Sequence, residues 1–189
     1  MGYGARDLLQ GQSVSLRGSH SFFEADLLPE ERTVQLPSPY EVDEHLADQP
    51  NKPTLPDLQQ PWISYGNLPR VIDWFHDGSI LIVDAPGHLP GHINLLIKTG
   101  PLTRVYLGGD ACHDRRIIRK QKEIGEWYDA DGHLCCIHAD RKLAEQTIER
   151  IQELERNGVE VIFAHDVEWE EDPRNKSRFW GQERPSTVS

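Results

Sequence analysis

The sequence predicts an α/β fold in which an amphipathic helix packs against a sheet. Short, nearly continuous apolar runs at residues 80–84, 93–97, 105–107 and 159–164 are typical of strands buried in a sheet. Residues 140–157 instead carry apolar side chains at spacings of three and four, which is the period of a helix. Buried strands beside one amphipathic helix favour a layered α/β arrangement.

The helix at 140–157 has the clearest boundaries. Asp140 is a favoured N-cap residue, because its carboxylate can accept hydrogen bonds from the N–H groups of the first turn. Gly158 stands where helices commonly end. These two residues predict where the helix starts and stops. Its apolar stripe consists of Leu143, Ala144, Thr147, Ile148, Ile151 and Leu154.

The centre of the chain, residues 80–110, is predicted to alternate strand and turn three times and to finish on an aspartate. Residues 85–92 break the apolar pattern with two prolines and two glycines, which are typical of turns. Residues 71–75 and the following Asp77–Gly78 pair predict a hairpin that leads into this unit. A strand fixes the residue at its end while the loop opens it to solvent, so these strand ends suit functional side chains.

The other segments carry weaker patterns. Prolines recur every few residues within 33–61, so we expect an irregular connection with a short strand at 33–36. Residues 117–126 have the composition of a helix, and 127–132 are expected to be a loop.

Length and charge restrict the class of protein. The 189 residues fit one domain, which we place at 1–170, followed by a charged, flexible tail at 171–189. The formal net charge of −11 argues against nucleic acid or an anionic membrane as partner, because both are repelled by it. No apolar run approaches the roughly 18 residues of a membrane span, and the N-terminus lacks a signal-peptide core. Three cysteines make no disulfide framework, which favours a cytoplasmic setting.

Three polar residues follow three of the predicted strands: His88, Asp110 and His165. If these strands end at the same edge of the sheet, the three side chains come together. Two imidazoles and a carboxylate form a ligand set suited to zinc, manganese or iron. The alternative is that each residue is a polar strand end that is hydrogen-bonded to a loop. The residues alone leave both interpretations open.

The motifs around these residues resemble those of the metallo-β-lactamase superfamily. The sequence APGHLPGH at 85–92 is similar to the TPGHTPGH turn of that superfamily, GGD at 108–110 to its strand-end aspartate, and FAH at 163–165 to its final ligand histidine. The order of these motifs is most similar to the N-acyl-homoserine lactonase-like branch, including its fungal members. The resemblance implies a partial metallo-β-lactamase αββα sandwich, of which this chain is the C-terminal two-thirds.

The resemblance also implies a site for two zinc ions and a small-molecule substrate, a lactone or a lactam. His88 and Asp110 would bind one ion and Asp110 and His165 the other, with a metal-bound hydroxide opening the cyclic ester or amide. His113 stands where the lactonase branch commonly has a tyrosine that donates to the developing oxyanion, and a histidine can also donate. Asp110 and His113 are thus the expected catalytic residues. The alternative for His113 is an exposed loop histidine.

One motif of the superfamily, HxHxDH, occurs nowhere in the chain, and His20 and His45 have no partners at its spacing. Zinc needs about four ligands, so His88, Asp110 and His165 could not fill two metal positions. We therefore expect a truncated domain that alone binds metal weakly and folds poorly. Two hypotheses follow: a zinc-dependent hydrolase lineage, or a catalytically incompetent remnant or binding module without a complete metal site.

Other side chains near these motifs offer substitutes without a clear signal. His113, His138 or Cys112 could supply a missing ligand, but nothing in their spacing indicates it. The adjacent cysteines at 135–136 could belong to a metal cluster, although half-buried small hydrophobic residues are the commoner case. His92 is expected to pack beside the site rather than to bind metal.

Overall fold

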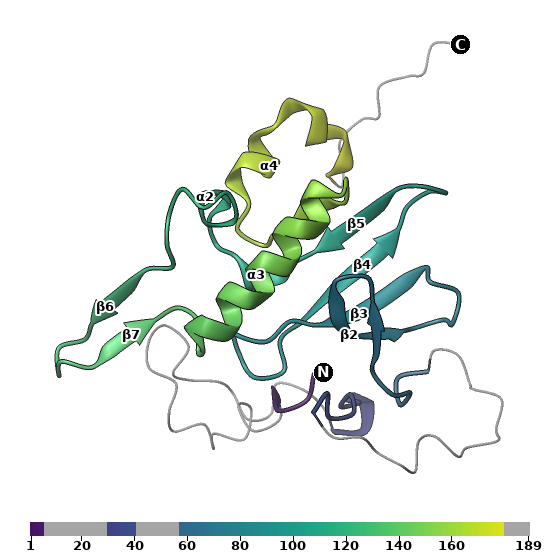
Figure 1. Cartoon of the computed structure of the whole chain (residues 1–189), viewed down its shortest axis with the longest axis horizontal. Coiled ribbons are helices and arrows are strands. Elements are labelled where there is room, and N and C mark those ends of the chain that lie inside the picture. The colour runs from purple at the N-terminus through teal and green to yellow at the C-terminus, as the bar shows by residue number, and fades with distance from the viewer. Residues whose placement is uncertain (6–29, 41–56, 180–189) are drawn as a thin grey trace.

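The computed structural model describes residues 1–5, 30–40 and 57–179. Its centre is a six-stranded sheet in the order β1-β2-β3-β4-β5-β8 (Figure 1). The first five strands form an antiparallel meander, whereas β5 and β8 pair in parallel. The strands are β1 (Ile63–Tyr65), β2 (Leu68–Asp73), β3 (Ile80–Asp84), β4 (Ile93–Lys98), β5 (Arg104–Leu107) and β8 (Glu160–Ile162).

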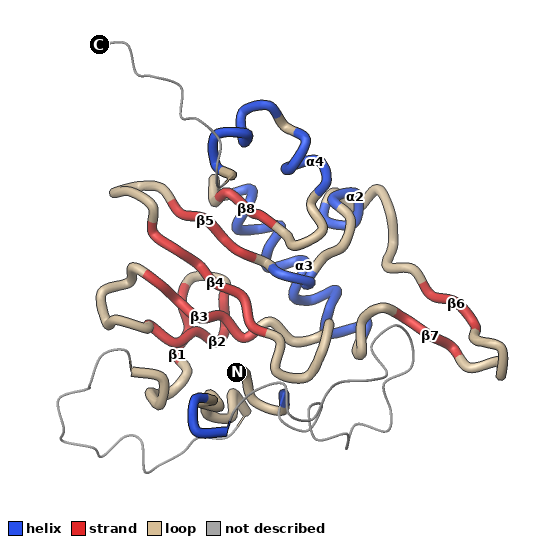
Figure 2. The backbone as a smooth tube through the Cα atoms, turned by 180° about the vertical axis from the view of Figure 1, so that it is seen from behind, coloured by secondary structure: helices blue, strands red, loops and turns tan. Residues whose placement is uncertain are grey.

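Between β5 and β8 the chain passes through short elements and one long helix, α3 (Arg141–Arg156). This helix lies across one face of the sheet, and the two-stranded sheet β6–β7 projects away from it (Figure 2). No helix in the described ranges is long and apolar enough to cross a membrane. The remaining elements are η1 (Glu30–Arg32), η3 (Gly109–Ala111), α2 (Arg115–Ile118), β6 (Glu126–Tyr128), β7 (Leu134–Cys136), α4 (Val167–Glu171) and η4 (Pro173–Arg178).

The predicted α/β fold is confirmed. The four apolar runs form β3, β4, β5 and β8, and the predicted helix is α3. The Asp140 carboxylate caps this helix by accepting a hydrogen bond from the Leu143 N–H at 2.9 Å. In the described residues one large sheet carries a helix on one face, which is a part of the predicted αββα sandwich.

The predicted hairpin is confirmed as β2 and β3, which pair antiparallel. Its turn contains the Asp77–Gly78 pair, and Gly78 adopts a φ of +69°. The Asp73 carboxylate accepts a hydrogen bond from the Gly78 N–H at 2.9 Å. This hydrogen bond closes the turn from the end of β2.

The helix predicted at 117–126 is wrong, because only residues 117 and 118 of that range are helical, at the end of α2. Only α2 forms, and Lys120 then adopts a left-handed φ of +57°. Ile118 and Ile124 are both buried in the main core. A continuous helix would place these two side chains about 120° apart around its axis, so the chain must turn for both to be buried.

The predictions for three further segments need correction or extension. The loop expected at 127–132 is part of a hairpin, because Asp129 accepts hydrogen bonds from the N–H groups of Asp131 and His133 and so joins β6 to β7. The strand expected at 33–36 does not form, and instead the Leu36 N–H donates to the Met1 carbonyl. The first described residues of the expected tail form the end of α4 and η4. His20, His45 and residues 180–189 lie outside the described residues.

The sheet is buried on both faces, and the two cores differ in size. The main core lies between α3 and the sheet. A smaller core on the opposite face contains Leu36, Ile72 and Ile82, with two tryptophans packed against them. Alternate residues of β3 thus serve different cores, as the period of a strand requires. The main core consists of Leu68, Val71, Leu81, Val83, Leu96, Tyr106, Ala111, Cys112, Ile118, Ile124, Ala144, Ile148, Ile151, Leu154, Val161 and Phe163.

The start of α3 is docked onto the turn that follows β3. The Ala139 N–H donates to the His88 carbonyl and the Asp140 N–H to the Gly87 carbonyl, both at 2.9 Å. The Thr147 hydroxyl donates to the Pro86 carbonyl at 2.7 Å. Gly87 has a φ of +127°, and a Cβ there would lie 2.2 Å from the Ala144 nitrogen. The helix can therefore approach this closely only because residue 87 is glycine.

A buried ion pair fixes the end of β8. The Arg115 guanidinium donates to both carboxylate oxygens of Asp166, at 2.8 and 2.9 Å, and to Glu155 of α3 at 2.7 Å. The Asp166 side chain is 2% exposed, and it also caps α4 by accepting from the Trp169 N–H. One arginine thus holds together α2, α3 and the residue after His165.

We predict that Gly87→Ala destabilises the fold and separates α3 from the turn. The positive φ alone costs about 1–3 kcal/mol for a residue with a side chain, and the overlap with the α3 backbone adds to it. Gly125→Ala is the matched control, because nothing lies within 4 Å of its Cβ position. Chemical denaturation of both variants measures the difference, and equal stabilities would contradict the docking described above.

We predict that Arg115→Leu lowers the free energy of unfolding by about 3–5 kcal/mol, because it leaves the buried Asp166 carboxylate without its cation. The neighbouring Arg116→Leu is the control, since Arg116 is 59% exposed and pairs with Asp114 at the surface. We expect this control to leave the urea midpoint close to that of the wild type. A midpoint for Arg115→Leu that matches the control would show that the ion pair contributes little.

Candidate metal centre

The three strand-end residues predicted from the sequence lie together. β3, β5 and β8 run in the same direction, so the segments after them meet at one edge of the sheet. The His88 Nε2 atom lies 3.7 Å from Oδ2 of Asp110, and the His165 Nε2 atom lies 3.1 Å from Oδ1 of the same carboxylate. Each oxygen of Asp110 therefore faces a different histidine, which is the arrangement of a carboxylate that can serve two positions.

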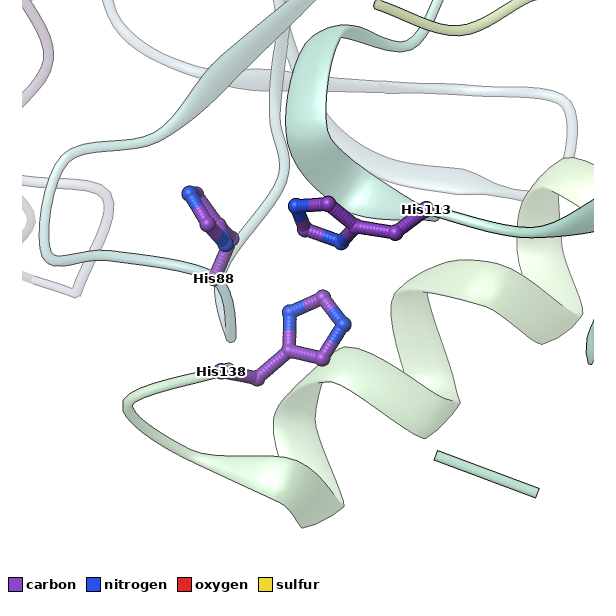
Figure 3. Close-up of side chains that lie close together, drawn as sticks. All are labelled: His88, His113 and His138. Atoms are coloured by element: carbon purple, nitrogen blue, oxygen red, sulfur yellow. The ribbon is translucent and has the colours of Figure 1, made fainter. Parts of the chain in front are cut away.

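Two further histidines complete the cluster. The His113 ring lies 5.2 Å from the His88 ring and 5.2 Å from the His165 ring, measured between centroids, and it stacks on His165 at 16°. The His138 ring lies 5.4 Å from His88 and 5.3 Å from His113. Figure 3 shows the rings of His88, His113 and His138 converging, with His138 coming from the segment just before α3.

The cluster contains two overlapping groups of potential metal ligands. One is His88, His113 and His138, and the other is Asp110, His113 and His165. Within each group the ligand atoms all lie within 4.8 Å of one another. The first group is largely buried, since His88 and His138 are each 2% exposed. The second is open to solvent, because the His165 side chain is 62% exposed.

A third group, Asp129, Asp131 and His133, lies at the turn of the β6–β7 hairpin. The Asp129 carboxylate is already engaged, because it accepts hydrogen bonds from the backbone N–H of Asp131 and from the backbone and ring of His133. These hydrogen bonds account for the geometry of the turn. We therefore assign this group a structural role.

His92 contacts the backbone beside Asp110. Its Nδ1 atom lies 3.2 Å from the Ala85 carbonyl, and its Nε2 atom accepts a hydrogen bond from the Asp110 N–H at 3.3 Å. Both contacts are satisfied by the tautomer with its proton on Nδ1. Gly109 adopts a φ of +49°, and a Cβ there would lie 3.2 Å from His92 Nε2. A glycine at this position lets the Asp110 backbone approach the ring.

In the buried ligand group, the surroundings of His88 favour the neutral ring, which can bind a cation, over the protonated ring. The pKa of His88 is lowered to about 3, mainly by burial and also by the neighbouring His92, His113 and His138, while Asp110 acts in the opposite direction. His88 is therefore a neutral imidazole near neutral pH. A neutral ring offers a lone pair to a metal ion, which is the form in which histidine binds zinc.

The cysteines do not join these groups. Cys112 is fully buried, its thiol donates to the Asp114 carbonyl, and burial raises the pKa of the thiol. Cys135 is 3% exposed and its thiol donates to the His133 carbonyl. Both behave as small buried residues, as predicted for the pair at 135–136, and Cys112 is not among the ligand groups of the described residues.

Sequence reasoning did not find His138 as a member of the cluster. It is 50 positions after His88, and the two meet only because the start of α3 docks onto the turn after β3. The available signal was weak: His138 stands two residues before the N-cap of the predicted helix, at the end where that helix meets the sheet edge. The placement of His113 beside both groups likewise required the fold.

The donor atoms of these residues suit zinc. Neutral imidazole nitrogens and a carboxylate oxygen are the donors zinc prefers in catalytic sites, where three protein ligands leave one position open. The buried ring of His88 already has the required protonation state. The described cluster supplies five donor residues, two more than the strand-end set predicted from the sequence.

Comparison with known proteins gives partial relatives. No protein-family model matches the chain. It is 36% identical over 111 residues to the cytochrome P450 monooxygenase mpaDE of Penicillium brevicompactum, a match that covers 51% of this chain and 13% of that protein. It is 44% identical over 50 residues to the metallo-hydrolase mfmC of Annulohypoxylon moriforme, covering 25% of this chain and 13% of the relative. The chain therefore spans a small part of the curated relatives it matches.

Solved structures with a similar fold include a quorum-quenching N-acyl homoserine lactone hydrolase. This match has 28% identity and a TM-score of 0.37, and it covers 49% of this chain and 34% of that chain. Another is a mutant of AiiA from B. thuringiensis with N-decanoyl-L-homoserine bound at its active site. This match has 24% identity and a TM-score of 0.39, and it covers 53% of this chain and 35% of that chain. The chain thus has partial sequence similarity to a metallo-hydrolase, and its motifs at 85–92, 108–110 and 163–165 resemble those of the metallo-β-lactamase superfamily.

Proposed function

We propose that this chain carries the metal-binding edge of a zinc-dependent hydrolase that opens a cyclic ester or amide, such as a lactone or a lactam. The observation that carries the proposal is the Asp110 carboxylate, whose two oxygens face His88 and His165 with His113 between the two histidines. The partial likeness to metallo-hydrolases and lactonases supports the same class of reaction.

The residues of the cluster have different roles, which follow from how deeply each is buried. His88 is enclosed and neutral, so it acts as a ligand and has no access to substrate. Asp110 is 37% exposed, and its two oxygens hold the buried and the open sides of the cluster together. When bound, zinc would polarise the carbonyl of the substrate and lower the pKa of a water molecule.

The open side of the cluster is where a substrate would approach. His165 is the most exposed of the three strand-end residues, so a small cyclic molecule can reach its edge of the site. His113 lies against it, and the His113 ring nitrogen that does not bind metal can direct its N–H toward the carbonyl oxygen as negative charge develops there. In this role His113 binds the substrate oxygen and stabilises its negative charge, while Asp110 holds the two sides of the cluster together.

We predict that the zinc-loaded chain hydrolyses members of a panel of lactones and lactams, and that Asp110→Asn lowers kcat/KM by at least about 100-fold. Loss of the carboxylate charge removes an anionic ligand shared by both sides of the cluster. Asp131→Asn, at the tip of the β6–β7 hairpin, is the matched control and should retain activity. Hydrolysis is followed by chromatography of the substrate and its ring-opened product, which applies to lactones and lactams alike.

We predict that treatment with a chelator abolishes this turnover and that added zinc restores it, because the reaction depends on the ion rather than on a protein nucleophile. Circular dichroism before and after chelation checks that the fold survives. A chain that binds no zinc and turns over none of the panel would instead support the alternative of a catalytically incompetent remnant or binding module.

A further inference from the structure

We propose that His138 is a metal ligand and that His88, His113 and His138 form a three-histidine position that binds one zinc ion tightly. The proposal shares the metal with the proposed function but does not require the hydrolysis reaction. It assigns a role to a buried histidine that the strand-end pattern does not include.

The first support is convergence from three separate parts of the chain. His88 lies in the turn after β3, His113 follows η3, and His138 precedes α3. Their ligand atoms lie within 4.8 Å of one another. Nitrogens bound to one zinc ion in tetrahedral geometry lie about 3.4 Å apart, so an inward movement of roughly 1 Å by the rings suffices to complete the set.

The second support is the rigidity of two of the three backbones. The segment that carries His138 is hydrogen-bonded to the turn that carries His88, through the Ala139 N–H and the Asp140 N–H. Asp140 also caps α3, so the helix start and the turn are one unit. Ligands held by packed, hydrogen-bonded elements need little reorganisation to receive an ion, which favours tight binding.

The third support is the balance of burial and charge. His88 and His138 are each 2% exposed. A histidine whose ring interacted only with solvent would lie at the surface. The Asp110 carboxylate lies 3.7 Å from the His88 ring. A divalent cation among three imidazoles, with one carboxylate beside them, matches the His₃ sets that zinc uses in catalytic sites.

The two ligand groups differ in what they can hold, because His113 belongs to both. When its ring is committed to His88 and His138, the open side keeps Asp110 and His165 alone. Two ligands that are 37% and 62% exposed make a weak position. The proposal therefore expects one tightly bound zinc per chain and a second, weaker binding step.

The experiment compares zinc binding in the full chain and in three single variants. After loading with zinc and dialysis, metal content is measured by atomic absorption and affinity by competition with a chromophoric chelator. We expect His138→Gln to weaken the tight step by at least about 100-fold, since it removes a direct ligand. His165→Gln should retain the tight step. His76→Gln is the control, because His76 lies in the β2–β3 turn and pairs with Asp57.

A second measurement keeps the test valid if His138→Gln does not fold. Zinc is titrated into the ¹⁵N-labelled wild-type chain, and the ring nitrogens of the histidines are followed by NMR. A change at one His138 nitrogen that saturates with the first equivalent supports the proposal. A folded His138→Gln variant with wild-type affinity, or an unchanged His138 ring at saturation, overturns it.

Activity separates this proposal from the proposed function. Tight zinc binding that depends on His138, without turnover of any lactone or lactam, would leave the three-histidine position in place and reject the hydrolase. Loss of the tight step in His165→Gln but not in His138→Gln would assign the ion to the open group and reject the three-histidine position.

Discussion

The site depends on one contact, the docking of the start of α3 onto the turn after β3. Two backbone hydrogen bonds join the 138–140 segment to Gly87 and His88, and the glycine removes the side chain that would keep them apart. This contact buries the apolar stripe of α3 against the sheet and, at the same time, sets His138 beside His88. Packing of the core and assembly of the histidine cluster are thus consequences of the same interaction.

Asp110 divides the cluster into a buried side and an exposed side. Toward the core, Asp110 faces His88, whose ring is kept neutral by burial. Toward solvent, it faces His165. His92 accepts a hydrogen bond from the Asp110 N–H, and Arg115 pairs with Asp166, the residue after His165. In the proposed metal centre, the ligands on one side are buried, and those on the other side are open to solvent.

The sequence predicted the elements whose pattern repeats over several residues. β3, β4, β5, β8 and α3 have strong periodicity, and each formed where it was expected. Residues 117–126 have the composition of a helix, but burying both Ile118 and Ile124 required the chain to turn at Lys120. The hairpin of β6 and β7 was missed because each strand has three residues and β6 is exposed throughout, so no apolar alternation marked them.

The sequence alone determined that His88, Asp110 and His165 each follow a predicted strand, and it predicted that they meet if those strands end at the same edge of the sheet. It could not determine the full ligand set. His113 follows a short helical turn, and His138 lies 50 positions from its partner His88, so no local spacing links them. Only the tertiary structure decided that these rings converge, because the placement of His138 depends on where α3 packs, and packing is a property of the whole core.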